Sequence, residues 1–110
     1  MTVEETIQDL IRRFTRKMTE DKEMRAEIKP LVKTFNLDLT TEQYSFRLEN
    51  AEISDYRKEL LEGADVTITT TPKYFQALVD GDLRPMRAYV MKKIAVKGKI
   101  KDLMFLKKFF

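Results

Sequence analysis

The spacing of apolar residues changes at Pro30, and this change constrains the fold more than any other feature of the sequence. Before Pro30, apolar residues recur every three or four positions, which predicts a helix with one buried face. They are Val3, Ile7, Leu10, Ile11, Phe14 and Met18. After Pro30, apolar and polar residues alternate over 35–39 and 44–48, which is typical of strands that bury one face. The chain therefore combines helices with a sheet.

The remaining elements are short, and several of their ends are marked by Pro or Gly. Residues 19–29 are expected to form either a second short helix, ended by Pro30, or a bent extension of the first. A third strand is expected over 51–58, a fourth over 64–70, helices over 72–80 and from Pro85, a fifth strand at 94–96 and a closing helix over 100–110. Thr71 and Pro72 are typical of a helix start, and Gly81 of a helix end.

This order predicts one α+β domain over residues 1–110, with a five-stranded, largely antiparallel sheet and helices covering one face. The opposite face carries Thr, Ser, Asn, Arg and Glu side chains, so we expect it to be solvated. Ser45, which alternates with aromatic residues along its strand, is accordingly predicted to face solvent.

The sequence contains no His and no Cys, which removes the side chains most often used as general base, thiolate nucleophile and transition-metal ligand. Acidic clusters such as Glu49, Glu52 and Asp55 lack the spacing of a calcium-binding loop. The three glycines lie too far apart for a phosphate-binding loop. We therefore expect a protein that is not an enzyme and that uses neither a cofactor nor a metal ion.

Membrane and secretory signals are also missing from the sequence. No apolar run approaches the roughly 20 residues that a membrane-spanning helix needs. The N-terminal sequence is acidic and has no apolar segment typical of a secretory signal. These two features lead us to expect a cytoplasmic protein.

Positive charge is concentrated toward the C-terminus. From Arg84 onward nine basic residues accompany one acid, Asp102, although the whole chain has a net charge of only +3. Five of these cations are candidates for contact with an anionic head group or an anionic membrane surface: Lys92, Lys93, Lys97, Lys99 and Lys101. A solvated surface is the alternative explanation, because charged faces also keep proteins soluble.

The second half of the chain holds more apolar residues than its short helices can bury. Residues 100–110 are apolar around most of a helix, so the closing helix needs cover on more than one side. Four covers are open: the sheet, a ligand, a bilayer or a partner subunit. The last would make the protein a homodimer and a non-enzymatic scaffold or accessory module. Nucleic-acid binding is not expected, because the aromatic residues of the basic segment alternate with Leu and Met as in a core.

Four segments of the second half resemble, in order and spacing, the sterol-carrier-protein family of lipid-transfer domains. The family's pattern is a strand with alternating Thr and Ile, a helix ending at Gly, a Leu-x-Pro-Met-x-Ala turn and helix, and a Lys-Ile-x-Val-x-Gly strand. The corresponding segments are Gly63–Thr69, Tyr74–Gly81, Asp82–Tyr89 and Lys93–Ile100. The first half resembles the family only in its layout of a helix followed by strands.

This resemblance implies a hydrophobic tunnel between the sheet and its helices, and a protein that carries lipid without catalytic residues. The ligand it implies is a fatty acyl chain, an acyl-CoA, a sterol-like molecule or a phospholipid. We expect the tunnel to be walled by the helix from Pro72, the helix from Pro85 and the closing helix. The candidates for ligand contact lie on the expected inward faces of these helices: Phe75, Val79, Met86, Val90, Leu103 and Met104.

Overall fold

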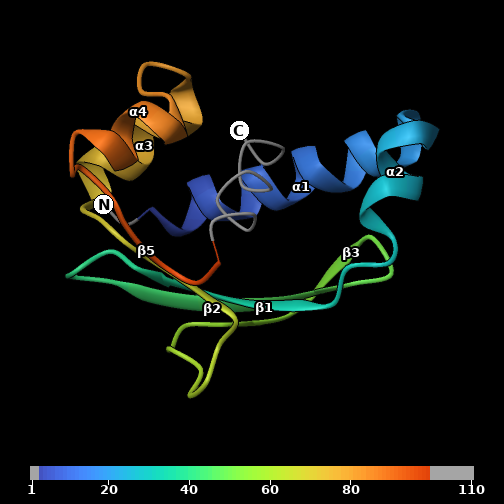
Figure 1. Cartoon of the computed structure of the whole chain (residues 1–110), viewed down its shortest axis with the longest axis horizontal. Helices are drawn as coiled ribbons and strands as arrows, with labels where there is room; N and C mark the ends of the chain where they lie inside the picture. Colours follow the sequence, from blue (N-terminus) through green and yellow to red (C-terminus); the bar gives the residue numbers. More distant parts are fainter. Residues whose placement is uncertain (1–2, 100–110) are drawn as a thin grey trace.

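Two helices precede the sheet in the chain (Figure 1). The computed structural model describes residues 3–99. The apolar stripe of the N-terminal segment forms α1 (Glu4–Glu20), which buries Ile7, Leu10 and Phe14 on one side. The chain then breaks at Asp21, whose carboxylate accepts a 3.0 Å hydrogen bond from the Met24 backbone N–H and so begins α2 (Lys22–Ile28). Residues 19–29 therefore contain a separate short helix.

The sheet has five strands in the order β3-β2-β1-β4-β5. Their bounds are β1 (Lys33–Asp38), β2 (Gln43–Glu49), β3 (Glu52–Arg57), β4 (Val66–Thr69) and β5 (Ala95–Lys97). Three of the four strand pairs are antiparallel, and β1 pairs with β4 in parallel, with Phe35 opposite Val66 and Leu37 opposite Ile68. The predicted α+β class and the largely antiparallel five-stranded sheet are confirmed.

Two further helices connect β4 to β5. The Thr71 hydroxyl accepts a 3.2 Å hydrogen bond from the Tyr74 N–H and begins α3 (Pro72–Asp80), which ends at Gly81 with φ of 82°. A tight turn leads to α4 (Pro85–Val90). Thus the local signals at Thr71, Pro72, Gly81 and Pro85 place both helices as the sequence predicts.

The molecule is built in layers, with the helices over one face of the sheet (Figure 1). α1 runs along this face, α2 lies at one end of it, and α3 and α4 lie at the other end. The core fills the space between these helices and the strands. Its largest fully buried side chains include Ile7, Met18, Ile28, Phe35, Leu39, Leu48, Val66 and Phe75.

The opposite face of the sheet is not fully solvated, contrary to the prediction. The loop 58–65 folds beneath the sheet (Figure 1) and is held there by Asn36. The Asn36 amide donates to the Leu61 carbonyl, and its carbonyl accepts from the Leu61 N–H, both at 2.8 Å. Asn36 is 5% exposed and Ser45, on the neighbouring strand, is 0% exposed. The prediction that Ser45 faces solvent is therefore wrong, because this loop covers the centre of the sheet.

Candidate functional site

An apolar cavity of about 30 Å³ lies between α1, the sheet and α3. Its described lining residues come from six elements: Ile7, Leu10 and Ile11 of α1, Phe35, Asn36 and Leu37 of β1, Phe46 of β2, Ile53 of β3, Ile68 of β4 and Phe75 of α3. Asn36 is the one polar residue in this set, and its amide is engaged by Leu61 of the loop. The wall is therefore hydrocarbon, and such a space favours an apolar guest over water.

Alternation along the strands places the floor of the cavity, and helical spacing places its roof. Phe35 and Phe46 lie opposite each other on β1 and β2, and their rings stack with centroids 5.1 Å apart. Ile7, Leu10 and Ile11 lie on the face of α1 that is turned to this floor. Every described wall residue except Asn36 is apolar, as core residues are. The cavity is therefore a gap within the hydrophobic core.

Polar contacts fasten the N-terminal end of α1 beside the cavity. The Val3 N–H donates to Glu42 Oε1 at 3.1 Å, and the same oxygen accepts from the Tyr44 hydroxyl. The Thr6 hydroxyl donates to Gln76 Oε1 of α3 at 2.8 Å. One end of the roof is therefore tied both to the sheet and to α3.

Two stacked tyrosines lie at this fastened end. The Tyr44 and Tyr56 rings have centroids 6.1 Å apart. Burial raises the pKa of Tyr44 well above its ordinary range, and the hydrogen bond to Glu42 raises it further. Burial likewise raises the pKa of Tyr56. Both hydroxyls therefore stay protonated and neutral at the edge of the apolar region at ordinary pH.

The whole-sequence comparison decides what kind of domain encloses this cavity. A sequence model of the SCP-2 sterol transfer family matches residues 11–110. The chain belongs to the SCP-2 sterol transfer family. The match extends over most of α1 and over the sheet, α3 and α4, so it includes the elements that enclose the cavity of this SCP-2 domain. No curated protein sequence matches the chain.

Solved structures share the SCP-2 fold. Sterol carrier protein 2 from Yarrowia lipolytica, in its apo form, is 25% identical with a TM-score of 0.62, and the match covers 94% of this chain and 85% of that one. Palmitated SCP2L2 from Aedes aegypti is 19% identical with a TM-score of 0.61, over 98% of this chain and 93% of that one.

An enzyme also contains this fold. The inverting sec-alkylsulfatase Pisa1 from Pseudomonas sp. matches with a TM-score of 0.64 and 19% identity. The match covers 77% of this chain, and the chain spans only 13% of the enzyme. The fold therefore occurs both as nearly a whole protein and as a small part of a larger one.

The ligand residues predicted from the sequence lie in different surroundings in the structure. Phe75 lines the cavity. Val79 is buried in the core cluster that contains Ile7 and Leu10, and Met86 is half-buried against the cluster around Phe14. Leu103 and Met104 lie outside the described residues.

The prediction that Val90 points inward is wrong. Its side chain is 73% exposed, whereas Ala88 and Ile94 are buried. The cause is a chain reversal at Lys92, which has a left-handed φ of 59° and turns the chain back under α4. This reversal brings Ile94 into the core and leaves Val90 outside, so the helix from Pro85 does not wall the cavity with Val90.

α1 is the part of the wall that sequence reasoning missed. The stripe containing Ile7, Leu10 and Ile11 predicted an inward face, but the expected tunnel was placed against the later helices. A stripe that packs solidly and one that borders a cavity have the same spacing. The sequence signal available for this part of the wall was the layout of a helix followed by strands.

The predicted lysines lie around α4 and β5. Lys92 and Lys93 follow α4, Lys97 ends β5, Lys99 comes shortly after, and Lys101 lies outside the described residues. Lys93 Nζ lies 5.5 Å from the centre of the Tyr74 ring. None of the four described lysines is among the described residues that line the cavity.

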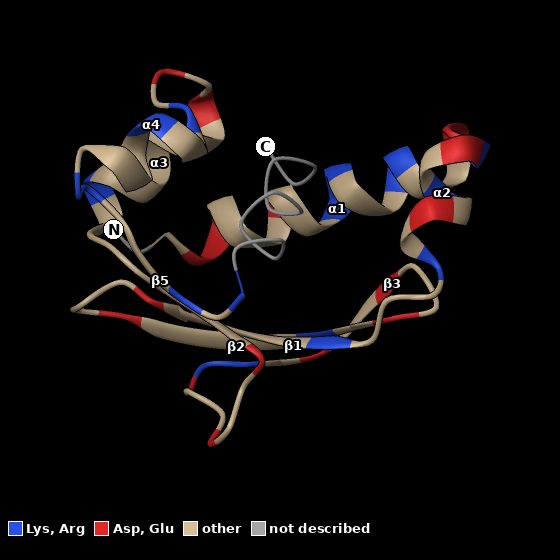
Figure 2. Ribbon diagram, viewed as in Figure 1, with Lys and Arg blue, Asp and Glu red and all other residues tan. Residues whose placement is uncertain are grey.

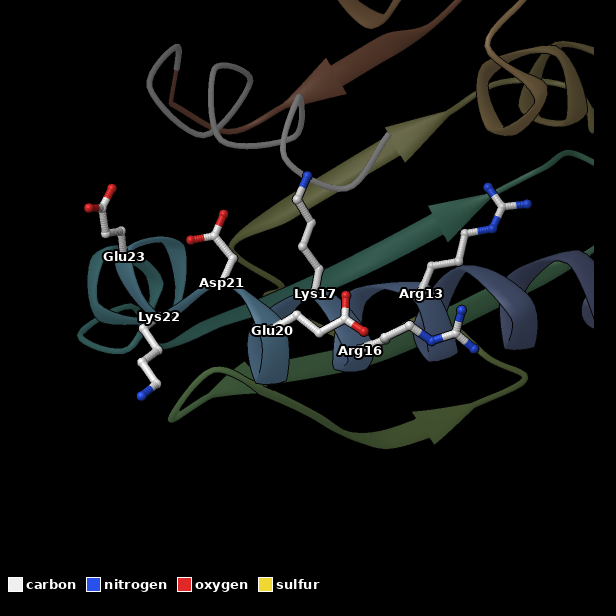
Figure 3. Close-up of a pocket in the computed structure, with 7 residues that line it drawn as sticks. All are labelled: Arg13, Arg16, Lys17, Glu20, Asp21, Lys22 and Glu23. Carbon is white, nitrogen blue, oxygen red and sulfur yellow. The ribbon is translucent and has the colours of Figure 1, made fainter.

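A second concave surface lies at the α1–α2 junction (Figure 3). Its seven lining residues are all charged: Arg13, Arg16, Lys17, Glu20, Asp21, Lys22 and Glu23. The cations Arg13, Arg16 and Lys17 lie along α1, the carboxylates lie toward α2 with Lys22, and these side chains extend from the helices (Figure 3). Among the residues that the structure describes, this open, mixed-charge surface offers no apolar wall to a lipid chain.

Residues 3–99 contain no cluster of three or more acidic side chains placed to hold a metal ion. Over the same range, no helix combines the length and the apolar character needed to cross a bilayer.

Proposed function

We propose that this SCP-2 domain binds and carries a lipid, with the apolar part of the ligand in the cavity between α1 and the sheet. The observation that carries the proposal is the hydrocarbon wall of that cavity. Membership of a sterol transfer family and the likeness to palmitated SCP2L2 support it. The ligand class is a fatty acyl chain, an acyl-CoA, a sterol-like molecule or a phospholipid. Carriage needs no catalysis, and the described lining residues supply neither a nucleophile nor a general base.

The cavity must widen to accept such a ligand. A volume of about 30 Å³ is close to that of one water molecule in the liquid, far less than an acyl chain. The strands are joined by backbone hydrogen bonds, whereas α1 meets the floor through the side chains of Ile7, Leu10 and Ile11. α1 is therefore the wall that moves, and its fastened N-terminal end serves as the pivot.

The energy of burial is sufficient for this opening. Transfer of about ten methylene groups from water contributes roughly 8 kcal/mol before entropy losses. Around the widened space, Phe75, Val79 and Met86 contact the ligand together with Ile11 and Ile53. We also propose Leu103 and Met104, which lie beyond residue 99, as ligand contacts.

We propose that basic residues act at the polar end of the ligand. Lys92, Lys93, Lys97, Lys99 and Lys101 attract an anionic head group or the anionic membrane from which the lipid is taken. Figure 2 shows basic positions on α4 and near the end of β5.

Ile11→Trp tests the cavity. Ile11 is a half-buried wall residue, so the larger indole fills the space without the strain of a fully buried replacement. We expect at least a tenfold loss of palmitate affinity and a matching loss of lipid co-purified with the protein. The measurements are titration with palmitate and mass spectrometry of extracted lipid.

Arg12→Trp is the matched control, because the neighbouring Arg12 side chain is exposed on the other side of α1. It should retain the affinity of the unmodified protein. If Ile11→Trp binds palmitate as well as Arg12→Trp does, the ligand does not occupy this cavity.

A further inference from the structure

Three consecutive large side chains are exposed where α4 ends. Tyr89 is 43% exposed, Val90 73% and Met91 48%. Within residues 3–99, the other large apolar side chain with comparable exposure is Val32 at 51%, and it stands alone between α2 and β1. Single exposed apolar residues are ordinary, whereas a contiguous group marks a surface that meets another apolar phase.

The backbone holds this group out of the core. The Lys93 N–H donates to the Ala88 carbonyl at 2.8 Å and closes the turn after α4, with Lys92 in the left-handed conformation at φ of 59°. Ala88 is 0% exposed and Ile94 is 5% exposed, so they anchor the turn on both sides. At such a position glycine is the residue with least strain. This chain has a cation there instead.

Cations flank the exposed apolar side chains in the sequence. Arg84, Arg87 and Lys92 are all exposed, and Lys93 follows them. The acids of the neighbouring segment, Asp80 and Asp82, lie at the end of α3 and in the turn before α4 (Figure 2). Asp80 accepts a hydrogen bond from Gln76 at 3.0 Å, within α3.

We propose that the α4 tip, defined as Tyr89, Val90 and Met91 with Arg87 and Lys92, docks on an anionic bilayer. The apolar side chains enter the interface between head groups and acyl chains, and the cations contact the lipid phosphates or carboxylates. This inference deepens the proposed function, on which it rests, by naming the surface that meets the membrane.

Charge favours a bilayer over a second copy of the chain as the occupant. A symmetric dimer through the α4 tip would bring the same cations of two subunits together, which repel each other. The charged surface at the α1–α2 junction is a poorer docking site, because it also carries the carboxylates of Glu20, Asp21 and Glu23 (Figure 3). The α4 tip is where exposed apolar area and positive charge coincide in the described chain.

Tyr89→Trp gives a direct test, because the chain contains no Trp and the variant carries a single fluorophore at the tip. With vesicles of phosphatidylglycerol we expect a blue shift of its emission and quenching by brominated acyl chains. With phosphatidylcholine vesicles alone, or at high salt, both effects should be lost. Val32→Trp is the matched control, since α2 and α4 lie at opposite ends of the molecule (Figure 1). An equal response from Val32→Trp would overturn the proposal.

Two further variants separate docking from folding. Val90→Gln with Met91→Gln removes exposed apolar area, and we expect at least a fivefold loss of vesicle affinity in flotation assays. Lys92→Gly removes one cation and should lower affinity about fivefold, while the strain at that position is relieved. Retained thermal stability together with this loss supports docking by the tip. Unchanged vesicle affinity in both variants would refute it.

Ligand binding without membranes keeps the two proposals apart. The variant with Val90→Gln and Met91→Gln should bind palmitate supplied from a cyclodextrin complex as well as the unmodified protein does. Failure of the unmodified protein to bind palmitate would contradict the cavity proposal alone. Dimerisation that Val90→Gln with Met91→Gln abolishes would assign the tip to a second copy instead of a bilayer.

Discussion

Tyr44 lies where the apolar face of the sheet meets the polar contacts of α1. Its side chain is 4% exposed, its hydroxyl donates to Glu42, and its ring stacks on Tyr56. The same Glu42 oxygen accepts from the Val3 N–H. One carboxylate therefore links β2 to the start of the helix that roofs the cavity.

The raised pKa of Tyr44 predicts a loss of stability at high pH. The native state keeps the phenolic proton, whereas the unfolded chain releases it near pH 10, so the free energy of unfolding falls as the pH rises above 10. Urea unfolding of the unmodified protein and of Tyr44→Phe between pH 9 and 11 measures this. The unmodified protein should lose up to about 1.4 kcal/mol per pH unit more than the variant.

Tyr89→Phe is the control for this experiment, because it removes a tyrosine from an exposed position. It should follow the pH dependence of the unmodified protein. Parallel pH profiles for Tyr44→Phe and the unmodified protein would contradict the prediction.

At the scale of elements, the end of α3 depends on one backbone conformation. Gly81 has φ of 82°, and its N–H donates to the Leu78 carbonyl at 3.3 Å. An added Cβ there would meet no atom within 4 Å, so the cost of a side chain is conformational rather than steric. This turn also sets the direction of α4 relative to α3.

Gly81→Ala should therefore destabilise the fold by about 1 kcal/mol and lower Tm by about 4 °C. Gly81→Asn should cost less, because asparagine tolerates the left-handed conformation better than alanine. Thermal unfolding followed by circular dichroism measures both variants. Equal Tm values for Gly81→Ala and the unmodified protein would contradict the assigned role of this glycine.

Elements with local end signals are those that the sequence predicts well. α3 has a hydroxyl cap at Thr71, a proline at its first position and a glycine at its end, all within eleven residues. α1 has a long apolar stripe. α4 is only six residues long, and so short a segment does not determine which of its side chains face inward; Ala88 is buried, whereas Val90 is exposed.

Contacts between residues far apart in the chain could not be predicted from the sequence. The loop 58–65 covers the sheet because Asn36 binds Leu61, 25 positions away, and no local pattern encodes that pairing. The cavity presents the same difficulty. Ile11 and Phe75 line it, while Val79 packs in the core beside it, although all three belong to apolar stripes. The difference lies in how the elements fit together in three dimensions.

At the scale of the whole molecule, ligand binding and stability are coupled. A lipid that binds the folded state at a free concentration 100 times Kd stabilises it by about 2.7 kcal/mol. We therefore expect palmitate to raise Tm of the unmodified protein more than that of Ile11→Trp. Differential scanning calorimetry at increasing palmitate concentration measures the effect, and a Tm independent of palmitate in the unmodified protein would contradict it.

The parallel pairing of β1 with β4 also governs how the chain reaches this structure. The β1-β2-β3 meander joins neighbours in sequence, whereas the β1–β4 ladder brings Phe35 beside Val66 across the intervening strands and loop. Closing so long a segment lowers chain entropy before its contacts compensate. We therefore expect the meander to form early in folding and β4 to pair with β1 afterwards, with β1 as the template.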